Sequence, residues 1–190
     1  MKKIFLLIFT LGLFSIFAQG KKNINWSQLL ESDHTDTIKE LGIPNMIDDT
    51  SFSGLNSENC IAYVFEYDGY MVYLEQPYKN DCGVRIERGL VLSGFEITEP
   101  SKVSLPLGLE ESDNFNTIIQ KLGTPSAFSN YQLKYILDAK NGRYWDLYWL
   151  NSSFSCKTYD KVLINLSEKN TIKSIFYIRH HDCIINESRK

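Results

Sequence analysis

The chain alternates short apolar runs with polar segments, and its first twenty residues, "MKKIFLLIFTLGLFSIFAQG", depart from that pattern. Residues 4–17 are apolar and uncharged, they follow two lysines, and the small residue Ala18 comes next. This combination is typical of a secretory signal peptide, and the run is shorter than the ~20 residues that span a bilayer. We expect residues 1–18 to be a cleaved signal peptide, the protein to be periplasmic or extracellular, and no membrane span to remain after cleavage.

Two later stretches, eighty residues apart, share one arrangement of polar and apolar positions: "ESDHTDTIKELGIP" and "ESDNFNTIIQKLGTP". The Ser-Asp pairs at residues 32–33 and 112–113 are good N-caps, because their side-chain oxygens accept bonds from the free N–H groups of a first helical turn. Gly42 and Gly123 suit the end of a helix, and the prolines that follow forbid its continuation. The pattern therefore predicts two short helices.

Strand-like runs follow each expected helix. The Asp68-Gly69 and Asn141-Gly142 pairs lie between apolar runs and are strong hairpin signals. Each unit then continues into a second hairpin, "CGVRIERGLVLSGFEI" in the first and "DKVLINLSEKNTIKSIFYIR" in the second. This order predicts an α+β fold of two tandem repeats, each a short helix followed by about four antiparallel strands. We expect the repeats at residues 24–100 and 101–190, forming one compact body.

A short helix that ends in Leu-Gly-x-Pro before a small antiparallel sheet resembles the repeat of the β-lactamase inhibitor protein family. It is also similar to small envelope lipoproteins of the BamE/SmpA type, although no lipid-anchor cysteine follows the apolar run here. The resemblance implies a fold whose exposed sheet face binds another protein.

Aligning the two hairpin turns also aligns the strands that follow them, and successive strand residues point to opposite faces. On these strands one set of alternate residues is apolar, and we expect its side chains to lie in the core. The alternate set, rich in tyrosine, is expected on a face open to solvent, where such residues are typical of protein-binding sites. This expected binding face comprises Tyr73, Glu75, Tyr144, Asp146 and Tyr148. The alternatives are that tyrosine is present because it favours strands, or that the other repeat covers the face.

Four cysteines, an even number in a chain expected to be exported, indicate disulfides. If Lys169-Asn170 forms the turn of the last hairpin, residues whose numbers sum to 339 lie opposite each other, and Cys156 and Cys183 satisfy this condition. Directly opposed residues are within disulfide reach. We predict a Cys156–Cys183 bond and, by elimination, a Cys60–Cys82 bond.

Charge and motifs exclude several classes of function. After signal cleavage, 18 basic residues face 23 acidic ones, with no basic stripe, so we expect no nucleic-acid partner. His180 and His181 are adjacent on an expected strand and point to opposite faces, so we expect no metal site. The sequence carries no phosphate loop, dinucleotide fingerprint or G-x-S-x-G motif, so we expect no cofactor and assign no catalytic residue.

These observations favour an exported, non-enzymatic module whose partner is another protein, with an inhibitor-like or immunity-like role. The alternatives are a small envelope hydrolase with a site between the repeats and a component of envelope assembly. A set of distant carboxylates that assemble only in the folded chain would be invisible to sequence motifs.

Overall fold

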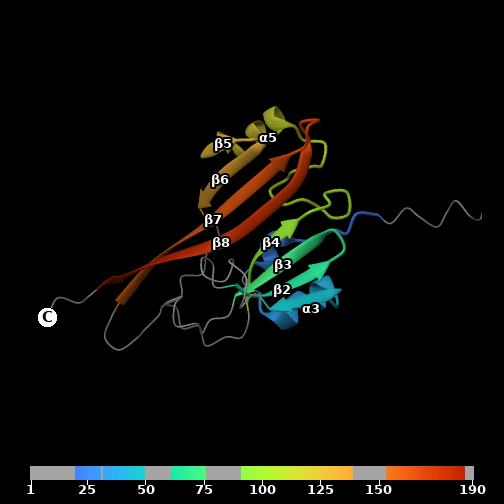
Figure 1. Cartoon of the computed structure of the whole chain (residues 1–190). Helices are drawn as coiled ribbons and strands as arrows, with labels where there is room; N and C mark the ends of the chain where they lie inside the picture. Colours follow the sequence, from blue (N-terminus) through green and yellow to red (C-terminus); the bar gives the residue numbers. More distant parts are fainter. Residues whose placement is uncertain (1–19, 31, 50–60, 76–90, 139–152, 187–190) are drawn as a thin grey trace, which may run out of the picture.

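The computed structural model describes residues 20–30, 32–49, 61–75, 91–138 and 153–186, and the structural statements below concern these residues (Figure 1). The helices in this part of the chain are α2 (Trp26–Leu29), α3 (His34–Leu41) and α5 (Phe115–Leu122). The strands are β1 (Met46–Asp49), β2 (Ile61–Tyr67), β3 (Tyr70–Glu75), β4 (Val91–Ile97), β5 (Ala127–Ser129), β6 (Gln132–Asp138), β7 (Ser153–Leu166) and β8 (Ile172–Asn186).

The described strands form one antiparallel sheet in the order β1-β2-β3-β4-β8-β7-β6-β5. This finding corrects the expected layout of two helix-plus-sheet repeats, because β4 pairs with β8 from Gly94↔Ile178 to Ile97↔Ile175 and makes the sheet continuous. In two separate sheets, β4 and β8 would each be an edge with unpaired N–H and C=O groups. Pairing them satisfies those groups within the protein.

The two outer strands were not predicted from the sequence. β1 and β5 begin within a few residues of the helix-ending Gly-x-Pro segments and pair with β2 and β6. They are only four and three residues long, which is too short for a recognisable alternation of apolar and polar residues. The strands expected immediately before residue 91 and after Asn141-Gly142 lie outside the described residues.

Both expected helices are present, and their ends follow the glycines. Gly42 and Gly123 are the C-caps, with φ of 87° and 83°, and their N–H groups donate to the carbonyls of Ile38 and Ile119, both at 2.8 Å. Asp33 caps α3 as predicted, accepting from the N–H of Asp36. The prediction for the second helix start was wrong by one residue or more, since Asn114 is the N-cap of α5 and Ser112 and Asp113 precede it.

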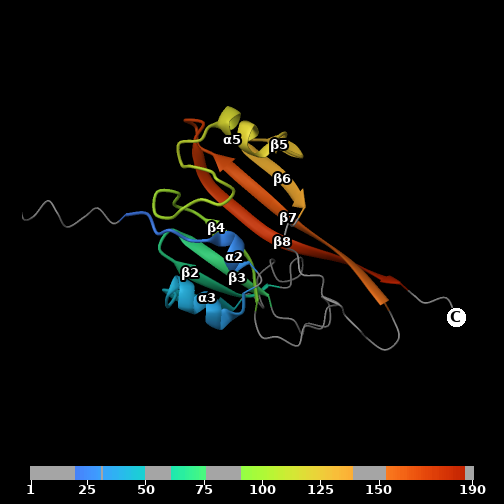
Figure 2. The ribbon, with the colours of Figure 1, turned by 180° about the vertical axis from the view of Figure 1, so that it is seen from behind.

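The helices contribute to a single hydrophobic core together with one face of the sheet. Figure 2 shows α2 in front of β3 and β4. Ile118 of α5 is completely buried, and Trp26 and Leu41 join the same cluster from α2 and α3. The cluster continues through sheet residues that include Phe65, Val72, Leu74, Phe95, Ile97, Leu133, Tyr135, Val162, Ile164, Ile175 and Tyr177.

The hairpin turns confirm two local predictions. Tyr67 pairs with Tyr70 around Asp68-Gly69. In β7–β8 the residue numbers of opposed pairs sum to 339 from Ser153↔Asn186 to Asn165↔Ser174, so the backbone register places Cys156 opposite Cys183. The disulfide between them stays a prediction.

The β7–β8 hairpin extends beyond the rest of the described sheet. The last pair of β6 with β7 is Asp138↔Tyr159, and the last pair of β4 with β8 is Gly94↔Ile178. β7 and β8 continue as a two-stranded ribbon, which projects from the sheet in Figure 1. Ribbons of two strands are marginally stable on their own. The predicted Cys156–Cys183 disulfide would therefore stabilise this ribbon.

None of the helices in the described ranges is long and apolar enough to cross a membrane.

Candidate functional site

The structure corrects the expected exposure of Tyr73. Its side chain points to the face opposite the core residues Val72 and Leu74, as predicted, but only 2% of it is exposed. It packs there with Val64 and Ile178, which come from β2 and β8. A hydroxyl buried among apolar side chains needs a partner, and the Tyr73 hydroxyl donates to the carboxylate of Glu96 at 2.8 Å. Tyr73 is therefore part of the packing on this face.

Glu75, at the end of β3, is partly buried. Desolvation raises the pKa of its carboxyl to about 7, because burial disfavours the charged form. The folded protein binds a proton here that the unfolded chain releases near pH 4.3, so this group opposes folding increasingly as the pH rises from about 4 to 7. Glu75 thus reduces stability at neutral pH.

The other residues of the expected binding face, Tyr144, Asp146 and Tyr148, lie outside the described residues, and so do Cys60 and Cys82. Other features of the described part of the molecule are better placed to carry a function.

A row of aromatic rings crosses the helix-covered face of the sheet. Trp26 of α2 stacks on Phe95 of β4 with ring centroids 4.1 Å apart, and Phe95 stacks on Tyr177 of β8 at 4.9 Å. On the other side of Trp26, Tyr70 makes an edge contact at 5.6 Å and stacks in turn on Tyr67 at 4.9 Å. Such ring pairs add about 0.5–1.5 kcal/mol each beyond burial of area, so the row ties β3, β4 and β8 to α2.

Both ends of the aromatic row are polar. At one end the Lys22 ammonium lies 5.8 Å from the ring centroids of Tyr67 and Tyr70, donates to the Tyr70 hydroxyl at 3.1 Å, and also donates to the carbonyl of Leu41. The lysine thereby links the segment before α2 to the end of α3. Burial lowers its pKa, while nearby Glu40 acts in the opposite direction.

At the other end the Tyr177 hydroxyl donates to Asp160 at 2.6 Å. The guanidinium of Arg179, which lies directly opposite Asp160 in the sheet, donates to both carboxylate oxygens at 2.8 and 3.0 Å. Asp160 and Arg179 are buried, and a buried ion pair needs this bidentate geometry to offset its desolvation. Desolvation and the bond to Asp160 both raise the pKa of Tyr177.

A cavity of about 180 Å³ opens beside the centre of the aromatic row. Its walls come from α2, β4, β8 and the segment after residue 104. They include Ile24, Trp26, Leu30, Phe95, Leu105, Pro106, Leu107 and Tyr177, with Asn25 and Ser27 as polar neighbours. The indole N–H of Trp26 donates to the carbonyl of Ser104 at 2.7 Å, and the Tyr177 hydroxyl donates to Asp160. The cavity is thus lined by aromatic and aliphatic side chains together with polar groups.

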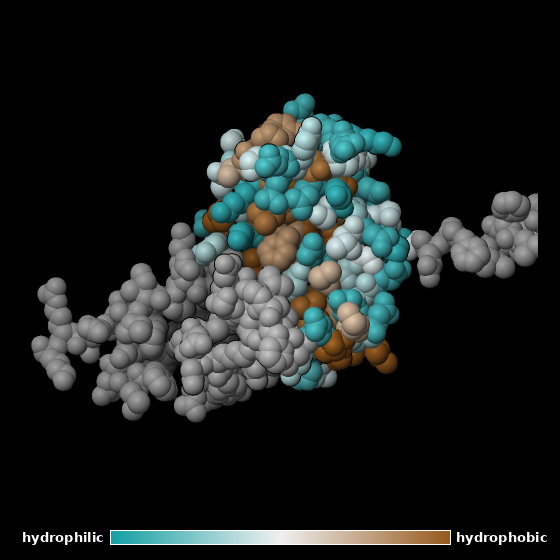
Figure 3. Space-filling view, viewed as in Figure 1, coloured by the Kyte–Doolittle hydropathy of each residue, from teal (hydrophilic) through white to brown (hydrophobic). Residues whose placement is uncertain are grey.

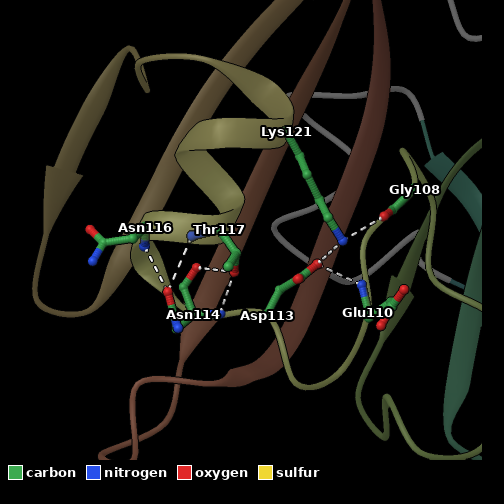
Figure 4. Close-up of polar contacts among 7 residues, drawn as sticks. All are labelled: Gly108, Glu110, Asp113, Asn114, Asn116, Thr117 and Lys121. Carbon is green, nitrogen blue, oxygen red and sulfur yellow. Dashed lines mark hydrogen bonds and ion pairs between the residues drawn. The ribbon is translucent and has the colours of Figure 1, made fainter.

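The polar cluster at the start of α5 is structural (Figure 4). Asn114 accepts from the N–H groups of Asn116 and Thr117, and the Thr117 hydroxyl accepts from the Asn114 N–H at 2.8 Å. Asp113 is buried, pairs with Lys121 at 2.7 Å, and accepts from the N–H of Glu110. Burial acts to raise the pKa of Asp113, but these bonds outweigh it, so the pKa is lowered.

Exposed apolar side chains gather at the two edges of the described sheet. At the β1 edge, Ile43 is 87% exposed, Met46 51% and Ile47 56%. In Figure 3 hydrophobic residues reach the surface at the end of the sheet where α3 and β2 lie in Figure 1. The remaining exposed large apolar residues of the described chain are Leu107, Phe128, Tyr131 and Ile136.

The β1 edge also presents acidic groups, and β1 is an edge strand of the described sheet. Met46 lies opposite Glu66 and Ile47 opposite the core residue Phe65, so the two exposed side chains project from opposite faces of the sheet. Asp48 is exposed on the same strand. β1 has β2 as its neighbour in the described sheet and has none on its other side, and such an edge is a template for another strand.

The described residues contain no group of three or more His, Cys, Asp or Glu side chains that could hold a metal ion.

Comparisons with known proteins give little similarity. No family model matches the chain, and no curated protein matches it significantly. Among solved structures, an extracellular protein containing an SCP domain from Bacillus anthracis str. Ames has a TM-score of 0.39 and 8% sequence identity. The match covers 86% of this chain and 51% of that chain, so this chain spans about half of that protein's length. A similarity of this size supports no conclusion about fold or function.

Sequence reasoning missed both the β1 edge and the cavity. The segment "GIPNMIDD" was interpreted only as the end of a helix, although three large apolar residues within five positions after a helix-ending glycine are a usable signal. The cavity has no comparable signal, because its walls come from four separate segments.

Proposed function

We propose that this chain is an exported, non-enzymatic module that binds an extended segment of another protein along the free edge of β1. The observation that carries the proposal is the exposure of Ile43, Met46 and Ile47 beside a strand edge that no other strand of the described residues pairs with. The expected signal peptide supports export.

An exposed strand edge flanked by apolar side chains can bind a partner by strand addition. An added strand forms backbone hydrogen bonds with the N–H and C=O groups of the edge, and its alternating side chains contact both faces of the sheet. Since Met46 and Ile47 project from opposite faces, one partner strand buries both. Complete burial of such a side chain stabilises a complex by about 1.5–3 kcal/mol.

Charge at the β1 edge defines the chemistry of the partner. Asp48 is exposed and Glu66 is half-buried opposite Met46. A partner segment that alternates apolar residues with lysine or arginine places its cations near these carboxylates, which favours it over an acidic segment.

A fluorescent peptide that alternates valine and lysine, compared with one that alternates valine and glutamate, tests this proposal by anisotropy. The basic peptide is expected to bind the purified protein, and Ile47→Asp is expected to weaken that binding at least about tenfold, because it places a charge where an apolar side chain would be buried. Phe128→Asp, at the opposite sheet edge, is the matched control and is expected to leave binding unchanged. Equal binding by both variants, or a preference for the acidic peptide, would contradict the proposal.

A further inference from the structure

We infer that two copies of this chain associate face to face, through the side of the sheet that the described helices leave open, about a twofold axis parallel to the strands. This dimer leaves the backbone groups of the β1 edge free and does not depend on the function proposed above. One row of side chains, which crosses every strand of the described sheet and is complementary to itself, supports it.

The register of the sheet places one residue of each described strand in a single row across this face. Neighbours in the row are directly opposed pairs, whose side chains lie on the same face of an antiparallel sheet. Two of them, Met71 and Phe176, pack on the cluster around Tyr73, on the face opposite the helix-covered core. From the β1 edge to the β5 edge, the row consists of Met46, Glu66, Met71, Glu96, Phe176, Leu163, Lys134 and Ala127.

This row is open to solvent along its length. Met46 and Ala127 are exposed at its two ends, and the residues between them are partly exposed. The eight strands of the described sheet are separated by seven spacings of ~4.8 Å, so the row is about 34 Å long. A standard interface of ~800 Å² per partner is roughly 32 Å across. Figure 3, which views this face, shows hydrophobic residues among hydrophilic ones across the sheet.

The row carries opposite charges toward its two ends. Glu66 lies on β2, next to the β1 edge, and Lys134 lies on β6, next to the β5 edge. Among the described residues neither side chain has an ion pair or a hydrogen bond. The two residues are five strand spacings apart, roughly 24 Å, so they do not pair within one copy.

A second copy supplies each of these charges with its opposite. A twofold axis parallel to the strands, between β4 and β8, reverses the order of the row in the second copy. Glu66 of each copy then faces Lys134 of the other, so the same pair forms twice. This reciprocity is what a twofold interface requires, because both copies contribute the same patch.

Between the charged pairs, the same axis brings apolar side chains together. Met71 faces Leu163 of the other copy, and burial of such side chains drives association. Phe176 faces Glu96, whose carboxylate keeps the bond that the Tyr73 hydroxyl donates at 2.8 Å. The result is an apolar centre with charged pairs outside it, as interfaces usually have, between two sheets whose strands are nearly aligned.

Sedimentation velocity of the purified protein, from about 1 to 100 µM, tests this dimer. The original protein is expected to sediment as a dimer at the upper concentrations. Glu66→Lys and Lys134→Glu are each expected to raise the dissociation constant at least about tenfold, because each places like charges opposite each other twice. Lys169→Glu, in the exposed turn after β7 and outside the row, is the matched control and is expected to remain dimeric.

The double variant Glu66→Lys with Lys134→Glu separates the interface from folding. It restores opposite charges across the axis, so it is expected to dimerise at least about tenfold more tightly than either single variant. Within one copy the two positions are roughly 24 Å apart, more than twice the ~10 Å Debye length at 0.1 M salt, so such a rescue acts between copies. The inference would be overturned by a monomer at all concentrations in the original protein, by single variants that dimerise as the original does, or by a double variant no tighter than the single ones.

Discussion

The segments α3–β1 and α5–β5 follow the same backbone path at opposite edges of one sheet. Gly42 and Gly123 have nearly equal φ and ψ, at 87° and −176° against 83° and −168°. The N–H groups of Asn45 and Ser126 each donate to the neighbouring strand at 2.7 Å. Each helix-ending carbonyl also accepts from a tyrosine hydroxyl, Tyr67 at 3.1 Å and Tyr135 at 3.3 Å.

The two segments differ in the side chains that hold the helices in place. α5 begins with a reciprocal capping box and an ion pair between Asp113 and Lys121. At α3, Asp33 itself is the cap, and the lysine that contacts the helix end is Lys22, which comes from outside the helix. The backbone path therefore depends on glycine and proline, while the polar side chains that support it are interchangeable.

The largest expected effect tests the shared glycine geometry. Gly42→Ala and Gly123→Ala are each expected to lower the free energy of unfolding by about 2 kcal/mol, because their φ and ψ lie in a region that is essentially restricted to glycine. No atom lies within 4 Å of an added Cβ at either position, so the cost is backbone strain alone. Gly20→Ala, which has open space and no left-handed φ, is the control in urea denaturation. Clearly unequal losses in the free energy of unfolding at positions 42 and 123 would show that the two helix ends are not equivalent.

The next largest loss of stability is expected from removing the ion pair at the start of α5, which is one of the features that distinguish α5 from α3. Lys121→Met is expected to lower the free energy of unfolding by about 1–2 kcal/mol at pH 7, because it leaves the buried Asp113 carboxylate without its charged partner. The control is Lys39→Met, in the last turn of α3, whose side chain is exposed. Its expected cost is below about 0.5 kcal/mol.

The stability difference between Lys121→Met and the original protein depends on pH, because the pKa of Asp113 is lowered in the folded protein. The stabilisation is fully present above the unfolded pKa of about 3.9 and is lost as the pH falls through the lower folded pKa. Urea denaturation of Lys121→Met and the original protein should therefore give converging stabilities in acid. A difference that stays constant down to pH 2 would show that Asp113 is not the group concerned.

The smallest effect tests the tyrosine hydroxyls that meet the glycine carbonyls. Tyr67→Phe and Tyr135→Phe are each expected to lower the free energy of unfolding by about 0.5–1.5 kcal/mol, the usual contribution of one hydrogen bond. Thermal denaturation at neutral pH is sensitive enough to measure this change. A stabilising effect in either variant would mean that the hydroxyl plays no part in the turn.

Parts of the candidate sites could be predicted and parts could not. The alternation of β3 correctly placed Tyr73 on the face away from Val72 and Leu74. Its burial could not be predicted, because Val64 and Ile178 are brought beside it by strands that are distant in sequence. The expected N-cap at residues 112–113 was wrong because Asn114 and Thr117 cap α5 reciprocally, and Asp113 pairs with Lys121.

The sequence by itself determined the C-terminal ends of α3 and α5 and the register of the β7–β8 hairpin. These features depend on backbone angles within a few residues, because glycine and asparagine accept left-handed angles and proline fixes φ and cannot continue a helix. Only the tertiary structure decided that β4 pairs with β8 in one continuous sheet, that β1 is an edge of the sheet formed by the described residues, and that a cavity opens beside Trp26. Each of these depends on which distant segments meet, and backbone hydrogen bonding between strands is the same whichever partner a strand takes.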